Sequence, residues 1–543
     1  MKKHIPALII ILLFALVGMK ALFHPGLFTA HDIWHQVARL YHYHQAVQDG
    51  QFPPYWIANL ANGFGYPLFF FSYHLPWILA LPLLGIGLSI PLTIKTLFII
   101  SYFFSGIVMY FFSFDLFKNK WAALTSTILY LWAPFHFVTI LVSAAMGTAF
   151  VFTLFPLLLW GLYKITHYKS PLGTIFTSLG LAGIILSHLM TTIFLIPLLS
   201  LWIFWLLKDQ KNKKNFLKKI IYAGLLGIGL AAFYFLPAIF YSRLTQVSSG
   251  AFASLYEKQF VNLTQLIYSK WGYGIADTAK EMNISFQIGI AQWIGVILTF
   301  VLIIMKKQRK NNFLGITLMT TFLISIFAMT DISRSVWVII SKIITLDYPT
   351  TFLLPATITG SLLAGFVVSQ VKTISPFASV LFIIIAIYTN RNHLRVNMYT
   401  NIPVSLYVAS ETTTNSYHEY LPKTADLGLF SEKIIRVLPQ NSAIENFKQN
   451  SKELSLKISL TREDNITLGH FSFPGLNLYV DEIKTIYDSE ERGRIKFPLT
   501  AGNYFIQLKF EDTPLIKISK LVTIGSLLYL LFLAFKNIYG KKS

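Results

Sequence analysis

Long apolar runs separated by short polar loops cover most of this chain. The first run lies at residues 5–23, and others follow at 74–90, 92–113, 121–141, 147–163, 172–188, 190–207, 219–241, 285–305, 313–329, 350–371, 373–389 and 516–537. Several approach the roughly 20 residues that an α-helix needs to cross a bilayer. Prolines and glycines interrupt the run at 74–90, as in a broken or re-entrant segment. The pattern predicts a polytopic α-helical membrane protein with about 12 to 14 spanning helices.

The pattern changes after residue 389. The stretches LSLKISL, ITLGHFSFP, LNLYVDE, TIYDS, GRIKFPL and NYFIQLKFED alternate apolar with polar residues between turn residues, which predicts strands with one buried face. We therefore expect a membrane domain at 1–389 with a first outer loop at 24–73, then a mainly β domain at 390–515, then a last helix and tail at 516–543. The β domain should be an antiparallel sandwich outside the membrane. Such a sandwich can bind sugars, bind a partner protein or cap the membrane domain, and of these roles capping is the first expectation.

Composition and charge narrow the class further. With 54% hydrophobic and 13% charged residues, the chain is not mainly a soluble domain, and with no cysteine it has neither disulfides nor thiolate metal sites. The net charge of +21 gathers in short loops between apolar runs, such as KDQKNKKNFLKK and KKQRKNN. This is the distribution of cytoplasmic loops and not of a nucleic-acid surface. We expect a multi-pass protein of the plasma membrane with both termini in the cytoplasm and no nucleic-acid partner.

The first outer loop, Thr29 to Tyr73, is rich in side chains that can carry out chemistry. If residues 30–48 form a helix, then Asp32, His35, Arg39 and His42 project from one face. A carboxylate beside imidazoles at a membrane edge suits acid/base catalysis or cation binding. A simpler interpretation is the solvated face of an amphipathic helix on the membrane surface.

A metal site is a further hypothesis for this loop. His31 and His35 have the spacing of paired ligands on a helix, and Asp32 lies between them. One such pair without a wider signature is a weak signal. A divalent metal ion is therefore an open hypothesis, and the sequence specifies no other cofactor.

Two histidines lie near the outer ends of apolar runs. They are His136, in LWAPFHF, and His188, in ILSHLM. Polar side chains within membrane segments are costly and are often functional, although each could also bond to a neighbouring helix.

Several motifs occur in an order that resembles a known family. They are GQFPPYW at 50–56, followed by NGFGYP and YHLP, then LSHL at 186–189, FYFLPA at 233–238, ETTTNSYHEYLPK at 411–423, and the tail FSFPGLNLYVDE with GRIKFPLTAGNYFIQLKF. Together they resemble the YfhO-like bacterial membrane proteins, which overlap a group labelled 6-pyruvoyl-tetrahydropterin synthase-related. That label implies no pterin chemistry. The resemblance spans most of the chain.

The resemblance implies a function, because that family is similar to the GT-C glycosyltransferases. Such enzymes take a sugar from a polyprenyl-phosphate carrier at the outer face, and an acidic residue of the first outer loop serves as base or helps to hold a metal. Here that role falls on Asp32. The expected partners are a polyprenyl-phosphate-linked sugar, an envelope glycopolymer or lipid acceptor, and membrane lipids.

The expected site residues follow from this hypothesis. Asp32, His35 and His188 are the predicted catalytic residues, with His35, Arg39 or His188 stabilising the phosphate leaving group. The turn from Tyr55 to Tyr66 should line a sugar pocket. The predicted binding residues are His31, Arg39, His42, Tyr55, Trp56, Asn59, Asn62, Tyr66, His136 and Asp347.

The sequence also departs from the pattern of the family. Where relatives often have an Arg and a Glu ahead of a proline-containing helix, this chain has SAAMGTAFVF at 143–152, with Thr148 near the expected Glu. DYPTTF at 347–352 stands where relatives often have a Phe-Pro-Trp-Arg element. Loss of an Arg and a Glu would weaken phosphate binding and reduce the capacity for acid/base catalysis. Two alternatives therefore accompany the transferase: a transporter or flippase of lipid-linked envelope precursors, and a non-catalytic envelope scaffold.

Overall fold

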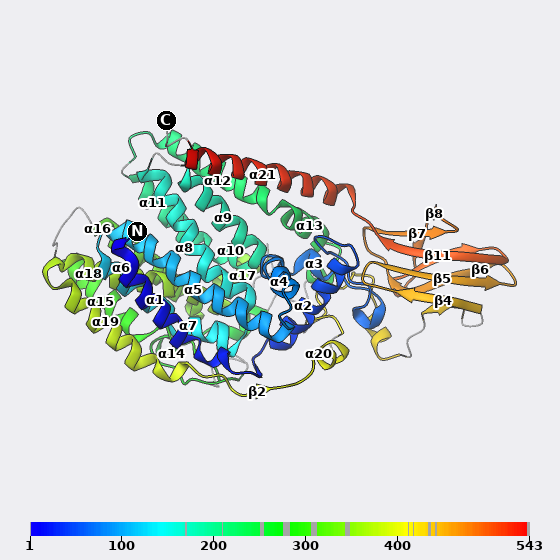
Figure 1. Cartoon of the computed structure of the whole chain (residues 1–543), viewed down its shortest axis with the longest axis horizontal. Coiled ribbons are helices and arrows are strands. Elements are labelled where there is room, and N and C mark those ends of the chain that lie inside the picture. Colours follow the sequence, from blue (N-terminus) through cyan, green and yellow to red (C-terminus); the bar gives the residue numbers. More distant parts are fainter. Residues whose placement is uncertain are drawn as a thin grey trace.

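The protein consists of a helical bundle with a β domain projecting from one end (Figure 1). The computed structural model describes residues 2–168, 171–208, 210–249, 255–274, 283–305, 312–342, 348–410, 412–415, 417–432, 436–439 and 443–539. Both chain termini lie at the end of the bundle away from the β domain. We call the end next to the β domain the β-domain end.

Within the described residues, six helices are long and apolar enough to cross a membrane. They are α5 (Ile90–Phe117), α8 (Met146–His167), α16 (Asn312–Met329), α18 (Leu353–Gln370) with the turn before it, α19 (Ser375–Asn390) with its flanking turns, and α21 (Pro514–Tyr539). Two bent pairs raise the number to as many as eight: α6 (Lys120–Leu131) with Pro134–Val142, and α12 (Lys213–Leu230) with α13 (Ala232–Ser242). Pro134–Val142 contains α7 (Pro134–Phe137) and a π-helical turn. A multi-pass helical membrane protein is confirmed.

Several predicted spans are shorter than a bilayer requires. The shorter apolar helices are α1 (Ile5–Gly18), α4 (Leu75–Gly85), α9 (Leu172–Ser187), α11 (Ile196–Lys208) and α15 (Ile290–Ile304). Length alone does not identify these as spans, so the total of about 12 to 14 stays a prediction. The remaining short helices are α2 (Ile33–Gln48), α3 (Leu68–Phe71), α10 (Leu189–Phe194), α14 (Leu263–Ile267), α17 (Arg334–Ser341) and α20 (Val404–Ser410).

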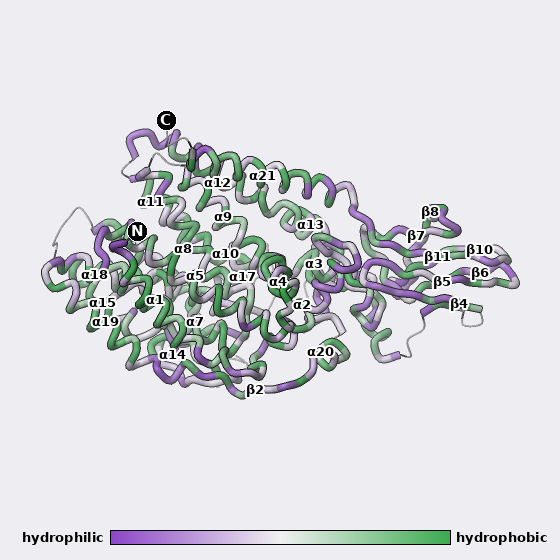
Figure 2. Tube along the Cα trace, in the orientation of Figure 1, coloured by the Kyte–Doolittle hydropathy of each residue, from purple (hydrophilic) through white to green (hydrophobic). Residues whose placement is uncertain are grey.

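The β domain is an antiparallel sandwich, as predicted. One sheet has the order β3-β6-β10-β9 and the other β4-β5-β11-β7-β8. The strands are β3 (Val437–Leu438), β4 (Ala443–Gln449), β5 (Glu453–Leu460), β6 (Asp464–Phe471), β7 (Leu476–Val480), β8 (Ile483–Thr485), β9 (Asp488–Ser489), β10 (Arg494–Leu499) and β11 (Gly502–Phe510). Leu454, Leu456 and Ile458 of β5 alternate into the buried core, which is the period-two pattern seen in the sequence. Figure 2 shows the same alternation of polar and apolar residues along the strands.

The segment before the sandwich differs from expectation. The first strand of the sandwich begins at Val437, whereas residues 391–432, as far as they are described, form a strap over the β-domain end of the bundle. In the strap, β2 (Tyr399–Thr400) pairs with β1 (Leu27–Phe28), and α20 follows. The Trp34 ring of α2 packs against the Tyr407 ring of α20 at a tilt of 51°, and its indole N–H donates to the Tyr407 carbonyl over 3.0 Å. The composition changes near residue 390, but period-two alternation starts only with the strands.

Candidate functional site

The site is built around the first turn of α2. Asp32 is the N-cap residue of this helix, yet its side chain accepts no hydrogen bond from a helix N–H. Instead the backbone holds it in place, because the N–H groups of His31 and Asp32 donate to the carbonyls of Val142 and Ser143 over 3.0 and 2.9 Å. The carboxyl group therefore remains available for other partners.

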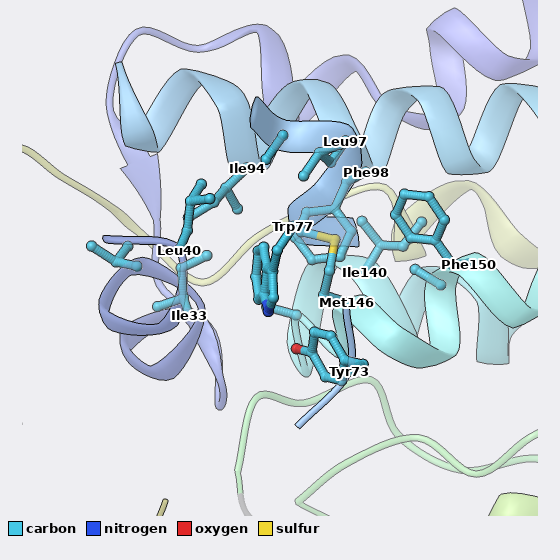
Figure 3. Close-up of a cluster of buried hydrophobic side chains, with 14 of the residues drawn as sticks. Ile33, Leu40, Tyr73, Trp77, Ile94, Leu97, Phe98, Ile140, Met146 and Phe150 are labelled. Carbon is cyan, nitrogen blue, oxygen red and sulfur yellow. The ribbon is translucent and has the colours of Figure 1, made fainter. Parts of the chain in front are cut away.

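The opposite face of α2 fixes the helix on the bundle. Ile33 and Leu40 are buried in the same cluster as Trp77 of α4 and Ile94 of α5, and Figure 3 shows these side chains close together. Asp32, His35 and Arg39 are half-buried on the other side. Because the apolar face of α2 packs against the bundle, its polar side chains lie at the β-domain end.

Four side chains that can carry positive charge act on the Asp32 carboxyl. Burial raises the pKa of Asp32 above its usual value, while Arg39, His35, His31 and His188, in that order, act to lower it. Arg39 and His35 lie in α2 and His31 lies just before it, whereas His188 comes from a distant part of the chain. The predicted grouping of Asp32, His35, Arg39 and His188 is thus present in the folded chain.

His188 reaches the site because the chain breaks between α9 and α10. Its backbone is extended, with φ of −163° and ψ of 90°. The ring Nδ1 accepts the N–H of Thr191 over 3.2 Å and lies 2.8 Å from the Thr191 hydroxyl oxygen. Because Nδ1 accepts a hydrogen bond, the neutral imidazole carries its proton on Nε2. The break therefore fixes both the position and the tautomer of the ring.

Arg39 is held by the strap. Its Nη2 donates to Asn415 Oδ1 over 2.6 Å and to the Thr414 carbonyl over 2.9 Å, and its guanidinium lies 5.8 Å from the centre of the Tyr73 ring. The Tyr73 hydroxyl in turn donates to Gln36 Oε1 over 2.5 Å. These contacts orient a cation at the site and join α2 to the strap.

Glu419 is a site residue that the sequence reasoning missed. Asn415 Nδ2 donates to Glu419 Oε1 over 2.9 Å, and Glu419 Oε2 is buried without a hydrogen-bond partner among the described residues. Burial raises the pKa of Glu419, while Arg39 and His35 act to lower it. The residue lies in the ETTTNSYHEYLPK motif, which was a signal of resemblance but carried no assigned role.

The metal hypothesis is not supported by the geometry. Across the described ranges, no three His, Asp or Glu side chains are grouped so that they could hold a metal ion. His31 Nε2 lies 3.1 Å from the Tyr273 carbonyl oxygen, which orients this ring toward the backbone of an outer loop. His31 and His35 therefore act electrostatically on Asp32, and the three residues do not form a set of metal ligands.

The predicted sugar-lining turn belongs mostly to the protein core. Tyr55 and Trp56 are buried in the core cluster of the β domain, where Trp56 stacks on Phe473 at 6.0 Å. Tyr66 is also buried, and its hydroxyl accepts the N–H of Tyr420 over 3.1 Å. Trp56 and Tyr66 therefore join the first outer loop to the β domain and the strap as core residues, whereas Tyr55 also lines a cavity beside the β domain.

The two asparagines of this turn are half-buried. The carbonyl of Asn62 accepts a hydrogen bond from Arg436 over 2.8 Å, and this contact also ties the loop to the start of the β domain. Asn59 stays a predicted binding residue.

Three other predicted binding residues lie elsewhere. His136 is buried and stacked on Phe152 at 3.8 Å, so it is a packing residue of the bundle and not a site residue. His42 is buried in α2, with its ring edge against Tyr41 at 5.3 Å. Asp347 lies outside the described residues.

Comparisons with known proteins do not show which family this chain belongs to. No protein-family model matches the sequence. An uncharacterized protein of Lactococcus lactis subsp. cremoris (strain MG1363) is 29% identical over 247 residues, which cover 44% of this chain and 40% of the relative. The cryo-EM structure of arabinofuranosyltransferase AftD from Mycobacteria aligns with a TM-score of 0.47 at 10% identity, over 74% of this chain and 28% of that chain. This chain thus spans less than half the length of either protein.

Proposed function

We propose that this protein is a membrane glycosyltransferase that moves a sugar from a polyprenyl-phosphate donor to an envelope acceptor. The observation that carries the proposal is the Asp32 carboxyl with Arg39, His35, His31 and His188 acting on it, at the end of the bundle where the β domain projects. A carboxylate can accept a proton, and cations beside it suit a phosphate leaving group. The resemblance of the sequence motifs to the YfhO-like and GT-C proteins agrees with this chemistry.

The proposed reaction balances without a further reactant. The acceptor hydroxyl oxygen attacks the anomeric carbon of the donor, and the ionised Asp32 carboxylate takes the hydroxyl proton. The bond from the anomeric carbon to the phosphate oxygen breaks, and the electron pair leaves with the phosphate. Arg39 stabilises the charge that develops on the phosphate, and His188 supports it through the proton on Nε2.

Glu419 acts in this proposal through its neighbours. Its carboxyl shares Arg39 and His35 with Asp32, and Asn415 binds both Glu419 and Arg39. We therefore assign Glu419 as a positioning residue that sets the orientation of the cations. It makes no proposed contact with the reacting atoms.

The proposal includes an orientation in the plasma membrane. His4 packs on Phe114 at 4.7 Å, and Lys118 donates to the Tyr168 hydroxyl over 2.8 Å, so the N-terminus and two loops with basic residues lie at one end. Basic loops face the cytoplasm in most membrane proteins. We therefore propose that the termini lie inside and that the Asp32 site lies outside with the β domain.

The deciding experiment compares lipid-linked sugars and envelope glycopolymers by mass spectrometry. The strains carry wild type, a deletion, Asp32→Asn, or the matched control Asp331→Asn, all three proteins at equal level. Asp331 is an exposed carboxylate paired with Arg334 over 2.5 Å, outside the site. Loss of one sugar decoration in the deletion and in Asp32→Asn, with build-up of its lipid-linked donor, supports the transferase. If the envelope changes in the deletion strain but not in the Asp32→Asn strain, then Asp32 is not the catalytic base. That result favours a transporter or a scaffold.

A further inference from the structure

A polar cavity lies apart from the Asp32 site. It has a volume of about 660 Å³ and is enclosed by the first outer loop, the β domain and the start of α21. Four lysines line it together with Phe52 and the ring of Tyr55: Lys452, Lys484, Lys517 and Lys520. Neither Asp32 nor any residue that acts on its carboxyl is among the lining residues. The cavity is therefore a separate feature of the molecule.

The lysines give this cavity an excess of positive charge. Lys520 pairs with Asp512 over 2.6 Å and donates to the Phe52 carbonyl over 3.3 Å. Among the described residues, no carboxylate lies within 4.0 Å of the ammonium groups of Lys452, Lys484 or Lys517. The lining holds four lysines against the two carboxylates of Glu511 and Asp512, so a net positive charge remains and favours an anionic ligand.

Polar groups beside the lysines can take part in binding as well. Glu511 lines the cavity, and its carboxylate accepts hydrogen bonds from Asn477 and from the Tyr479 hydroxyl. A carboxylate held in this way, together with the Asn477 amide, can bind hydroxyl groups next to an anion. The lining therefore suits a phosphate group with attached hydroxyls better than a simple inorganic anion.

The cavity lies beside the start of the exposed apolar surface of α21. Ile518 and Leu521 of α21 are 57% and 68% exposed, although both are apolar, so the lipid-facing surface begins within a turn of Lys517. Figure 2 shows that α21 stays hydrophobic over most of its length beyond this point. Lysines at the end of a spanning helix extend to the phosphate layer of the bilayer. On the outer side such lysines run against the usual charge distribution, which points to a binding role.

We propose that this cavity binds the phosphate head group of an anionic membrane phospholipid at the outer end of α21. The head-group phosphate contacts Lys452, Lys484 and Lys517, its hydroxyls face Asn477 and Glu511, and its acyl chains lie along the apolar side of α21. The proposal goes beyond the glycosyl-transfer function and does not rest on it.

The test measures lipid retained by the purified full-length protein. The protein is reconstituted in nanodiscs of phosphatidylglycerol or of phosphatidylcholine and then released. Native mass spectrometry measures the lipid that stays bound to it. Wild type should retain phosphatidylglycerol in preference to phosphatidylcholine. The variant Lys452→Gln/Lys484→Gln/Lys517→Gln should bind phosphatidylglycerol on the order of a hundredfold more weakly. The control Lys448→Gln/Lys457→Gln/Lys496→Gln changes the same charge on the β domain outside the cavity and should bind like wild type.

Competition with inorganic phosphate and with glycerol phosphate separates a lipid from a soluble ligand. Equal retention of phosphatidylglycerol by both triple variants would overturn the proposal. Displacement of the lipid by inorganic phosphate, with no preference between the two phospholipids, would assign the cavity to a soluble phosphate compound and would also overturn it. Sugar transfer is not part of the readout, so failure here is distinguishable from failure of the proposed function.

Discussion

Asp32 and Glu419, which lie far apart in the sequence, share the same two basic neighbours, His35 and Arg39. Asp32 caps α2 in the first outer loop, whereas Glu419 lies in the strap. Two buried carboxyls that compete for the same positive charges are electrostatically coupled. Each group therefore influences the protonation of the other, and this coupling leads to measurable effects.

Activity should fall as the pH is lowered through the raised pKa of Asp32. The base works only when it is ionised, and burial moves its pKa above the usual value of 3.8. The acid limb of kcat/KM should therefore lie at a higher pH than for an exposed aspartate. A pH profile of transfer by the reconstituted protein measures this limb, and a flat profile down to the ordinary range would contradict the assignment.

Glu419→Gln should move that acid limb to lower pH. The substitution removes a negative charge that competes for Arg39 and His35, so these cations stabilise the ionised form of Asp32 more strongly. The maximal rate should fall by roughly tenfold, because the cations are less well positioned. A purely structural role would reduce the rate and leave the limb in place. Glu453→Gln, in β5 away from the site, is the control.

Asp32→Asn should abolish transfer and slightly stabilise the protein at neutral pH. The folded-state pKa is raised, so ionised Asp32 costs stability as pH rises above its unfolded pKa, and stability is greatest below it. Asparagine removes that cost, and we expect a Tm higher by on the order of 1 to 3 °C at neutral pH. The difference should shrink as the pH is lowered. A lower Tm for Asp32→Asn at neutral pH would contradict the raised pKa.

Arg39→Lys should reduce sugar transfer and weaken the attachment of the strap to α2. Lysine cannot reproduce the guanidinium geometry that reaches the Thr414 carbonyl and Asn415 Oδ1 together. We expect a loss of transfer of roughly 10- to 100-fold and faster protease cleavage within the strap. Arg334→Lys tests the same change at an exposed ion pair, and cleavage of the strap at the same rate in both variants would argue against the tether.

Gly65→Ala should destabilise the junction between the first outer loop and the β domain. Gly65 has φ of +88°, and an added Cβ would overlap the Trp56 ring. We expect a loss of roughly 2 to 4 kcal/mol, measured by thermal unfolding. Gly50→Ala is the matched control, because Gly50 has φ of +84° but open space around an added Cβ, and it should lose only about 1 kcal/mol. Equal losses would show that packing on Trp56 contributes nothing.

The sequence predicted those parts of the fold that depend on local periodicity. Strand alternation located the sandwich, and helical spacing placed Asp32, His35 and Arg39 on one face. Glu419 escaped detection because its position beside Arg39 depends on the path of the strap, which no local pattern encodes. The sequence did not show that Trp56 and Tyr66 are core residues, because an aromatic turn looks the same in sequence whether it lines a pocket or joins two cores. His136 was misassigned since a histidine stacked in a bundle has the same sequence context as one in a site.

The strap and α21 attach the β domain to the bundle at two points. The strap leads into the domain from α19, and α21 leads out of it. A single protease cut within the strap would therefore leave both fragments embedded in the membrane. Such a cut would release Glu419 and Asn415 from their place beside Arg39 while the amount of membrane-bound protein stayed the same. In a cell, this molecule could be inactivated without being shed, and its abundance would be a poor measure of its working population.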